Sequence, residues 1–325
     1  MRFHPNHTLK LIDESAFHTE IANVETVLSA YAQVGRFVGC DQATLHYEYF
    51  LAEDPQGSIV VVHGLSEFTK KFYEFAYYAL NQGYNVFLYD QRCHGLSDRL
   101  TPREDVLHVD SFADYAVDLE RFMEEVVLPA DEVPVYLYSH SMGGAVCALY
   151  LADHPDKVAK AVFSAPLFEP VVAAVPAWLA RLSVRVGTCL CGPKKRFFLS
   201  NDFDPDVRYI EAYGSSKARF DHNINLRKQD KRYQSSPMSF SWVWQSLTVR
   251  RTVLNPTFID KIRTPILLIS AENDRTVRNQ PQREFAKNCP SCEFLEIAGA
   301  THALLAAKNE ELESLLKLTF AYLSA

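Results

Sequence analysis

Short runs of β-branched and aromatic residues alternate along this chain with longer amphipathic segments, and this alternation limits the folds open to it. The runs at 58–62, 84–89 and 134–138 are each followed by a segment of helical periodicity or a loop leading to one, and the rhythm returns with runs at 266–270 and 293–297. Alternation of this kind is typical of βαβ units, in which helices cover both faces of a mostly parallel sheet. The sequence therefore predicts an α/β fold. Helices are expected over 15–31, 70–81, 111–127 and 142–153, near 280–288 and from 309.

The strand–helix rhythm fails in the middle of the chain, between 167 and 255. Such an interruption is typical of an insertion above the carboxyl ends of the strands, where open α/β sheets place their ligand sites. Near the N-terminus, 15–31 forms a separate helix ahead of the first strand. We therefore expect a helical N-terminal extension (1–33), a core built from 34–166 and 256–325, and an inserted cap (167–255).

The charge balance and the hydropathy of the chain argue against several classes of protein. Lysine and arginine number 33 against 40 acidic residues, a formal net charge of −7, whereas a nucleic-acid-binding protein needs a basic surface. No stretch approaches the ~18 uninterrupted apolar residues of a membrane span, and the N-terminal residues lack the apolar region of a secretory signal. We therefore expect no nucleic-acid partner, no transmembrane segment and a cytoplasmic location, with peripheral contact at the inner face of the membrane left open.

The cysteines number seven and are scattered, which is typical of reduced thiols in a cytosolic protein. Cys289 and Cys292 have the spacing of a redox or zinc pair, and Cys189 and Cys191 would complete a set of four ligands. Nothing else in the chain resembles a zinc ribbon. We therefore expect no metal, and the role of the Cys289–Cys292 pair stays open.

The run at 134–138 ends on Ser139-His140-Ser141-Met142-Gly143, directly before a helical segment. Ser-x-Ser-x-Gly between a buried strand and a helix is similar to the nucleophile elbow of α/β-hydrolases, usually written G-x-S-x-G. The sharp turn requires small residues at both outer positions; Gly143 meets this, and Ser139 is small where glycine is usual. The helix would also aim its free N–H groups at negative charge developing near Ser141. The alternative is an ordinary N-cap serine.

A nucleophilic serine needs a base, and the base needs an orienting acid, which follow in the chain order Ser, Asp/Glu, His in this fold. The strand at 266–270 leads into Asp274, our choice for the acid, with Glu272 as the nearer alternative. The strand at 293–297 leads into His302, the histidine that fits this order. The alternative for His302 is a capping or surface role.

An acyl-transfer site also needs N–H donors for an oxyanion. His63 and Gly64 follow the first buried parallel strand, so the backbone N–H groups of Leu65 and Met142 are the expected pair. The loop at 89–99 follows a second strand, and we interpret it as structural, with direct substrate contact as the alternative.

Six sequence blocks together resemble the monoglyceride lipase-like serine hydrolases, and most closely their bacterial lysophospholipase branch. The blocks are VVHGLSEFTKKFYEFA, DQRCHGLSD, SHSMGGA, SAPLFEP, SAENDR and GATHALL, and the resemblance extends from about residue 34 to residue 324. It implies an α/β-hydrolase fold, a Ser141–Asp274–His302 triad, an oxyanion hole at Leu65 and Met142, and no metal or organic cofactor. Glu67 fits the acidic position after the His-Gly turn, and the insertion should be a cap with an acyl-chain tunnel.

Within the cap, Trp178 and Leu182 fall on one apolar helical arc that is edged by arginines. We expect these two residues, together with His63 and Gly64, to contact the substrate; a lipid-facing surface and ordinary core packing are the alternatives for the arc. The basic runs 194–196 and 250–251 could meet phosphate by charge, although such runs are usually solvated.

We therefore predict a carboxylic ester hydrolase whose partner is a lipid ester. The expected substrate is a lysophospholipid, cleaved through an acyl-enzyme on Ser141. The alternatives are a monoacylglycerol lipase, a short-chain carboxylesterase or, from a different class, a non-catalytic binding protein of the same fold.

Overall fold

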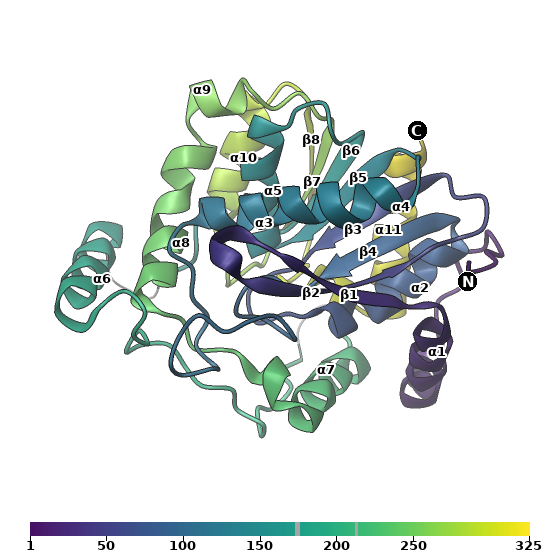
Figure 1. Cartoon of the computed structure of the whole chain (residues 1–325), viewed down its shortest axis with the longest axis horizontal. Helices are drawn as coiled ribbons and strands as arrows, with labels where there is room; N and C mark the ends of the chain where they lie inside the picture. Colours follow the sequence, from purple (N-terminus) through teal and green to yellow (C-terminus); the bar gives the residue numbers. More distant parts are fainter. Residues whose placement is uncertain (173–175, 212–213) are drawn as a thin grey trace.

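The computed structural model describes residues 1–172, 176–211 and 214–325, and one mixed sheet runs through the centre of this part of the chain (Figure 1). The strand order is β1-β2-β4-β3-β5-β6-β7-β8. The pairs β1–β2 and β2–β4 are antiparallel and the other neighbours are parallel, which confirms the predicted fold class. The strands are β1 (Gln33–Val38), β2 (Thr44–Phe50), β3 (Gly57–Val62), β4 (Tyr84–Tyr89), β5 (Val135–His140), β6 (Lys160–Ser164), β7 (Ile266–Ala271) and β8 (Cys292–Ile297).

Helices cover both faces of the sheet, and the side chains of the central strands alternate between two core clusters. In β3, Val60 and Val62 point into one cluster, whereas Ile59 and Val61 point into the other. Burial on both faces explains why the central strands are nearly continuous apolar runs. The first cluster includes side chains from α3 (Phe112–Phe122), α5 (Met142–Asp153), α8 (Phe240–Val253) and α10 (Asn279–Asn288); the second includes side chains from α1 (Phe17–Tyr31), α2 (Tyr73–Asn81) and α11 (Asn309–Ser324).

The helix predicted over 111–127 is one regular helix only in its first part. Ser111 begins α3 with a capping box shared with Asp114. After α3 the chain forms a π-helical turn, Met123–Val127, and then the short α4, Leu128–Ala130. Pro129 lacks the N–H that would continue the α-helical ladder, which favours the altered hydrogen bonding of the preceding turn.

The N-terminal helix α1 is part of the core packing. Its apolar stripe, Phe17, Ile21, Val24 and Leu28, is buried in the second core cluster. At its first residue α1 also contacts a helix of the predicted cap, α7 (Lys217–Gln229), where the ring of Phe17 meets His222 edge-on. The extension therefore joins the core to the insertion.

The described residues of the predicted cap form three longer helices, and these differ in how they meet the core. The helix α8 packs against α5 and places Phe240 and Trp242 in the first core cluster. The helix α6 (Ala177–Cys191) packs on α8 and lies at the outer edge of the molecule (Figure 1). The division into extension, core and cap stays a prediction. The remaining short helices are η1 (Glu14–Ala16), η2 (Cys40–Gln42), η3 (Thr69–Phe72), η5 (Lys231–Gln234), α9 (Pro256–Ile259) and η6 (Leu304–Ala306).

Candidate active site

Ser141 stands between the end of β5 and the start of α5 with a positive φ of 52° and a ψ of −116°. Such a backbone conformation is strained for a residue with a side chain and is typical of functional turns. The turn also presses α5 against β3, since a Cβ added to Gly143 would lie 1.9 Å from the Val62 carbonyl oxygen. Ser139 is fully buried, and its hydroxyl donates to the Val162 carbonyl over 3.3 Å. A serine therefore fits where glycine is usual.

Ser141, His302 and Asp274 lie in one hydrogen-bonded chain. The His302 Nε2 atom is 2.9 Å from the Ser141 Oγ atom, and the His302 Nδ1 atom is 2.6 Å from Asp274 Oδ2. Because a carboxylate accepts, Nδ1 carries the proton and Nε2 is left to accept the serine hydroxyl proton. Burial lowers the pKa of His302 below its ordinary value, against the raising effect of Asp274. The imidazole is therefore in the form that a general base requires.

The loop after β7 holds Asp274 rigidly. Its side chain is fully buried, and Oδ1 accepts hydrogen bonds from the backbone N–H groups of Thr276 and Val277, at 2.8 and 2.9 Å. The alternative acid, Glu272, instead accepts from the Gly299 N–H over 2.8 Å and joins its loop to the one that leads to His302. The structure thus brings Asp274, and not Glu272, onto the imidazole.

The expected oxyanion donors lie on the two segments that meet at Ser141. Gly64 is packed against the nucleophile, since an added Cβ there would lie 3.0 Å from the Ser141 Cβ atom. The N–H groups of Leu65 and Met142 donate to no atom within the described ranges of the chain. Met142 is the first residue of α5, so the positive end of the helix dipole faces the same place. Both N–H groups are thus unpaired among the described residues, as the donors of an oxyanion hole must be.

The side chain of His63, which we expected to contact substrate, forms hydrogen bonds to the backbone of two loops. It is 1% exposed; its Nδ1 atom donates to the Gly64 carbonyl over 2.8 Å, and its Nε2 atom accepts from the Gln91 N–H over 3.0 Å. Burial lowers the pKa of His63 and so favours this neutral ring. With both nitrogens engaged, it offers none to a substrate. Substrate contact at His63 and Gly64 stays a prediction, and for His63 it would not involve the ring nitrogens.

A second group of polar side chains, centred on Glu67, lies beside the triad. Glu67 Oε2 accepts from the Gly64 N–H over 2.6 Å and lies 3.0 Å from His140 Nδ1, while Oε1 pairs with Lys71. Burial would raise the pKa of Glu67, but His140 and Lys71 outweigh it and hold that pKa well below the usual range. Sequence reasoning missed His140; its position directly before the nucleophile was the available signal.

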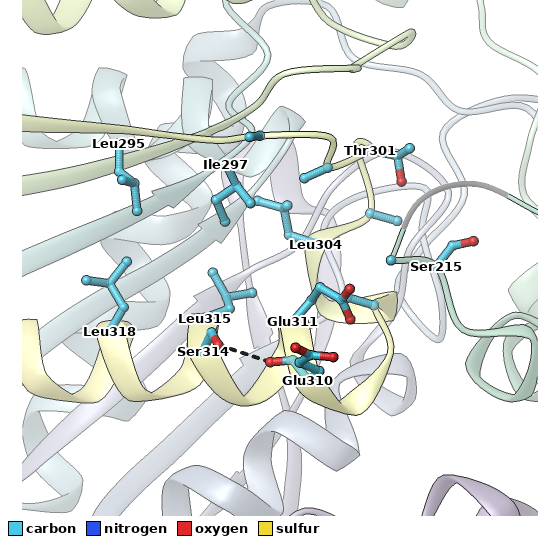
Figure 2. Close-up of a pocket in the computed structure, with 15 residues that line it drawn as sticks. Ser215, Leu295, Ile297, Thr301, Leu304, Glu310, Glu311, Ser314, Leu315 and Leu318 are labelled. Carbon is cyan, nitrogen blue, oxygen red and sulfur yellow. Dashed lines mark hydrogen bonds between the residues drawn. The ribbon is translucent and has the colours of Figure 1, made fainter.

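Two cavities flank the loop that carries His302. One, of about 320 Å³, lies between β8, this loop and α11, where Leu295, Leu315 and Leu318 form apolar walls (Figure 2). The other, of about 450 Å³, lies between α1, α7 and the first residues after the His63–Gly64 turn. Thr301, next to His302 in sequence, lines both cavities. The active site therefore adjoins two spaces large enough for parts of a ligand.

The cap residues that we expected to contact substrate do not line these two cavities. Trp178 and Leu182 are 63% and 49% exposed on the outer helix α6, and neither lines either cavity beside the triad. Of the basic runs, Arg250 is held by Glu169 at 2.5 Å and Glu284 at 3.0 Å. That arginine is therefore engaged in ion pairs within the protein, and substrate contact at Trp178 and Leu182 stays a prediction.

The cysteines and helices of the described residues raise no further site. Cys189 and Cys191 are exposed on α6 whereas Cys289 is buried, and all seven thiols are free. Within the described ranges, metal-type ligands gather in a group of three only at Cys40, Asp41 and Asp114. None of the described helices is both long enough and apolar enough to cross a bilayer.

Comparison with known proteins links this geometry to hydrolases. A family model described as "Serine aminopeptidase, S33" matches residues 53–309. The chain is 28% identical over 264 residues to Lysophospholipase L2 of Escherichia coli (strain K12), covering 81% of this chain and 75% of that protein. It is 23% identical over 281 residues to the Monoglyceride lipase of Saccharomyces cerevisiae, covering 79% and 80%.

A solved structure shows the same architecture. The chain superposes on a soluble variant of the Saccharomyces cerevisiae monoglyceride lipase, solved with a substrate analog, with a TM-score of 0.72 at 19% identity. The match covers 90% of this chain and 95% of that one. The arrangement of sheet, helices and strand-end loops is thus that of an α/β-hydrolase fold.

Proposed function

The chain belongs to the serine aminopeptidase S33 family, and on that premise we propose that it is a serine carboxylic ester hydrolase acting on single-chain lipids, with lysophospholipids as the main substrates. The observation that carries the proposal is the hydrogen-bonded chain Ser141–His302–Asp274, at 2.9 and 2.6 Å. Similarity to a lysophospholipase and to a monoglyceride lipase supports the substrate class.

The mechanism follows from the positions of these groups. The Ser141 Oγ atom attacks the ester carbonyl carbon while His302 Nε2 takes the hydroxyl proton, and Asp274 stabilises the imidazolium. The carbonyl oxygen, now an anion, accepts hydrogen bonds from the Leu65 and Met142 N–H groups. When the intermediate collapses, the carbon–oxygen bond to the alcohol breaks and His302 protonates the leaving oxygen. Water, deprotonated by His302, then releases the fatty acid and restores the serine.

We also propose that the protein contacts a membrane surface peripherally, through the apolar residues exposed on its cap. Trp178, Leu182, Val186 and Leu190 recur every four residues along α6 and are 63%, 49%, 47% and 80% exposed. Arg181 and Arg185 lie on the same helix. A helix that exposes an apolar face and also carries basic residues is typical of an interfacial contact. Such contact would give access to single-chain lipids at the bilayer.

The test measures product release from a graded panel, with a Ser141→Ala protein beside the wild type. The panel holds lysophosphatidylcholine, lysophosphatidylethanolamine, monoacylglycerol, p-nitrophenyl esters of increasing chain length and an aminoacyl p-nitroanilide. Preference for the lysophospholipids, lost in Ser141→Ala, is the expected result. If monoacylglycerol or short esters are preferred, the head-group assignment is wrong; if only the anilide is cleaved, the protein is a peptidase.

A further inference from the structure

The larger cavity beside the triad, of about 450 Å³, begins next to the reacting groups. Its lining includes His140, which directly precedes Ser141, and Thr301, which directly precedes His302. From there it extends between α7 and the N-terminal helix α1, where Phe17 and Ile21 form part of the wall. The helix α1 lies before the matched region 53–309, so this wall is a feature of this chain beyond the family match.

The cationic side chains that line this cavity fall into two kinds. Arg219 is held on Glu74 by two hydrogen bonds of 2.6 and 2.9 Å, and Lys71 is paired with Glu67. Their charges are therefore already balanced. Each of these pairs builds the wall of the cavity and leaves little charge for a ligand.

The charges of Lys70 and Arg208 are not neutralised by a carboxylate at such short distance. The nearest carboxylate oxygen to the Lys70 ammonium belongs to Glu25, at 3.9 Å, and Arg208 is exposed and forms no ion pair with any of the described residues. Burial lowers the pKa of His222, another lining residue, to about 4, so this ring is neutral near pH 7. The cavity therefore carries an excess of positive charge on Arg208, and Lys70, which Glu25 holds only at 3.9 Å, lies on the same lining.

We infer that Lys70 and Arg208 bind the phosphate of the substrate's head group while its ester lies at Ser141. The inference rests on the function proposed above. In a lysophospholipid the glycerol backbone separates the ester from the phosphate, so the phosphate must lie a short way from the nucleophile, as this cavity does. Lysine and arginine both form charge-assisted hydrogen bonds to phosphate oxygens.

The other charged surfaces near the site fit a phosphate less well. At one end of the smaller cavity, Glu310 and Glu311 of α11 present carboxylates, which repel an anion (Figure 2). In the cap, Arg250 is neutralised by Glu169 and Glu284. Lys70 and Arg208 thus form the cationic pair with both a cavity and access to the reacting groups.

The test compares two substrates with the same short acyl chain, lysophosphatidylethanolamine and monoacylglycerol, at concentrations where both are monomeric. The variants are Lys70→Gln, Arg208→Gln and the double substitution. The matched control is Lys157→Gln/Lys287→Gln, which removes the same charge from exposed lysines outside the cavity. Thermal unfolding of each protein checks that it is folded.

For the double variant we expect KM for the lysophospholipid to rise about tenfold or more, since a hydrogen bond to a charged group contributes at least that factor. Its kcat, and both constants for monoacylglycerol, should stay near the wild-type values. Glycerol 3-phosphate should inhibit the wild type competitively, and the double variant only at correspondingly higher concentration.

Each other outcome overturns a specific statement. An unchanged ratio of kcat/KM for the two substrates, or an equal loss in the control, overturns the phosphate site alone. A wild type that cleaves monoacylglycerol but not the lysophospholipid overturns the head-group proposal and this inference with it. Activity retained in Ser141→Ala overturns the serine mechanism, whatever the result at Lys70 and Arg208.

Discussion

The His140 Nε2 atom lies 3.2 Å from the backbone carbonyl oxygen of His302, so the residue before the nucleophile contacts the residue that activates it. The other ring nitrogen, Nδ1, lies 3.0 Å from Glu67 Oε2. His140 therefore links Glu67 to the backbone of His302 and is positioned to hold that backbone in place.

Replacing His140 by Gln should lower kcat by about 10- to 100-fold with little change in KM, because a small displacement of the base has an effect of this size. Glu67→Gln should act in the same direction, since it removes the charge that keeps His140 in place. The two changes disrupt one network, so the double variant should lose little more than either single variant. Steady-state kinetics of the three proteins measure this coupling. Fully additive losses would mean that the two residues act separately.

The pH dependence of kcat/KM should report the protonation of His302. The base must be neutral to accept the serine proton, so activity should rise with pH and then level off. Because burial lowers the pKa of His302, the midpoint should lie below the ordinary value of 6.5. Asp274→Asn removes the partner that raises this pKa; the midpoint should move further down, and the plateau should fall by about 10⁴-fold.

Glu272→Gln is the matched control for the acid, because Glu272 lies two residues from Asp274 and contacts a backbone N–H instead of the imidazole. It should keep the wild-type midpoint and most of the activity. If Glu272→Gln lost as much activity as Asp274→Asn, the roles assigned to the two carboxylates would have to be exchanged.

Ser139→Gly introduces the glycine that is usual at this position of the elbow. The substitution removes a 3.3 Å hydrogen bond to the Val162 carbonyl and adds backbone freedom, so it should lower the free energy of unfolding by about 1 kcal/mol. Activity should stay within about threefold, because Oγ of Ser139 points to β6 and away from the site. Ser139→Val should instead lose most activity, since the position is fully buried. Urea unfolding and esterase kinetics check both variants.

The strands and the elbow were predictable because their physical requirements are local. A buried strand needs a short apolar run, and the sharp turn at Ser141 needs small residues at fixed offsets. Asp274 and His302 were predictable because parallel strands bring their carboxyl ends to one edge of the sheet. The contacts of His140 were not, because Glu67 and the His302 carbonyl lie 73 and 162 residues away in the chain. The contact between α1 and α7 and the ion pairs of Arg250 also join segments that are far apart in the chain, so the sequence did not predict them.

Membrane contact through the cap should depend on the exposed apolar side chains of α6. Replacing Val186 and Leu190 by Ser removes two side chains that are 47% and 80% exposed on α6, so folding should be little affected. Binding to vesicles of anionic lipid should weaken by about tenfold or more, since each large apolar side chain contributes ~1.5–3 kcal/mol when buried. Cosedimentation with the vesicles measures this binding. Hydrolysis of a water-soluble p-nitrophenyl ester should be unchanged. Val34→Ser, 63% exposed on the edge strand β1, is the control; if it weakened binding as much, the cap would not be the contact surface.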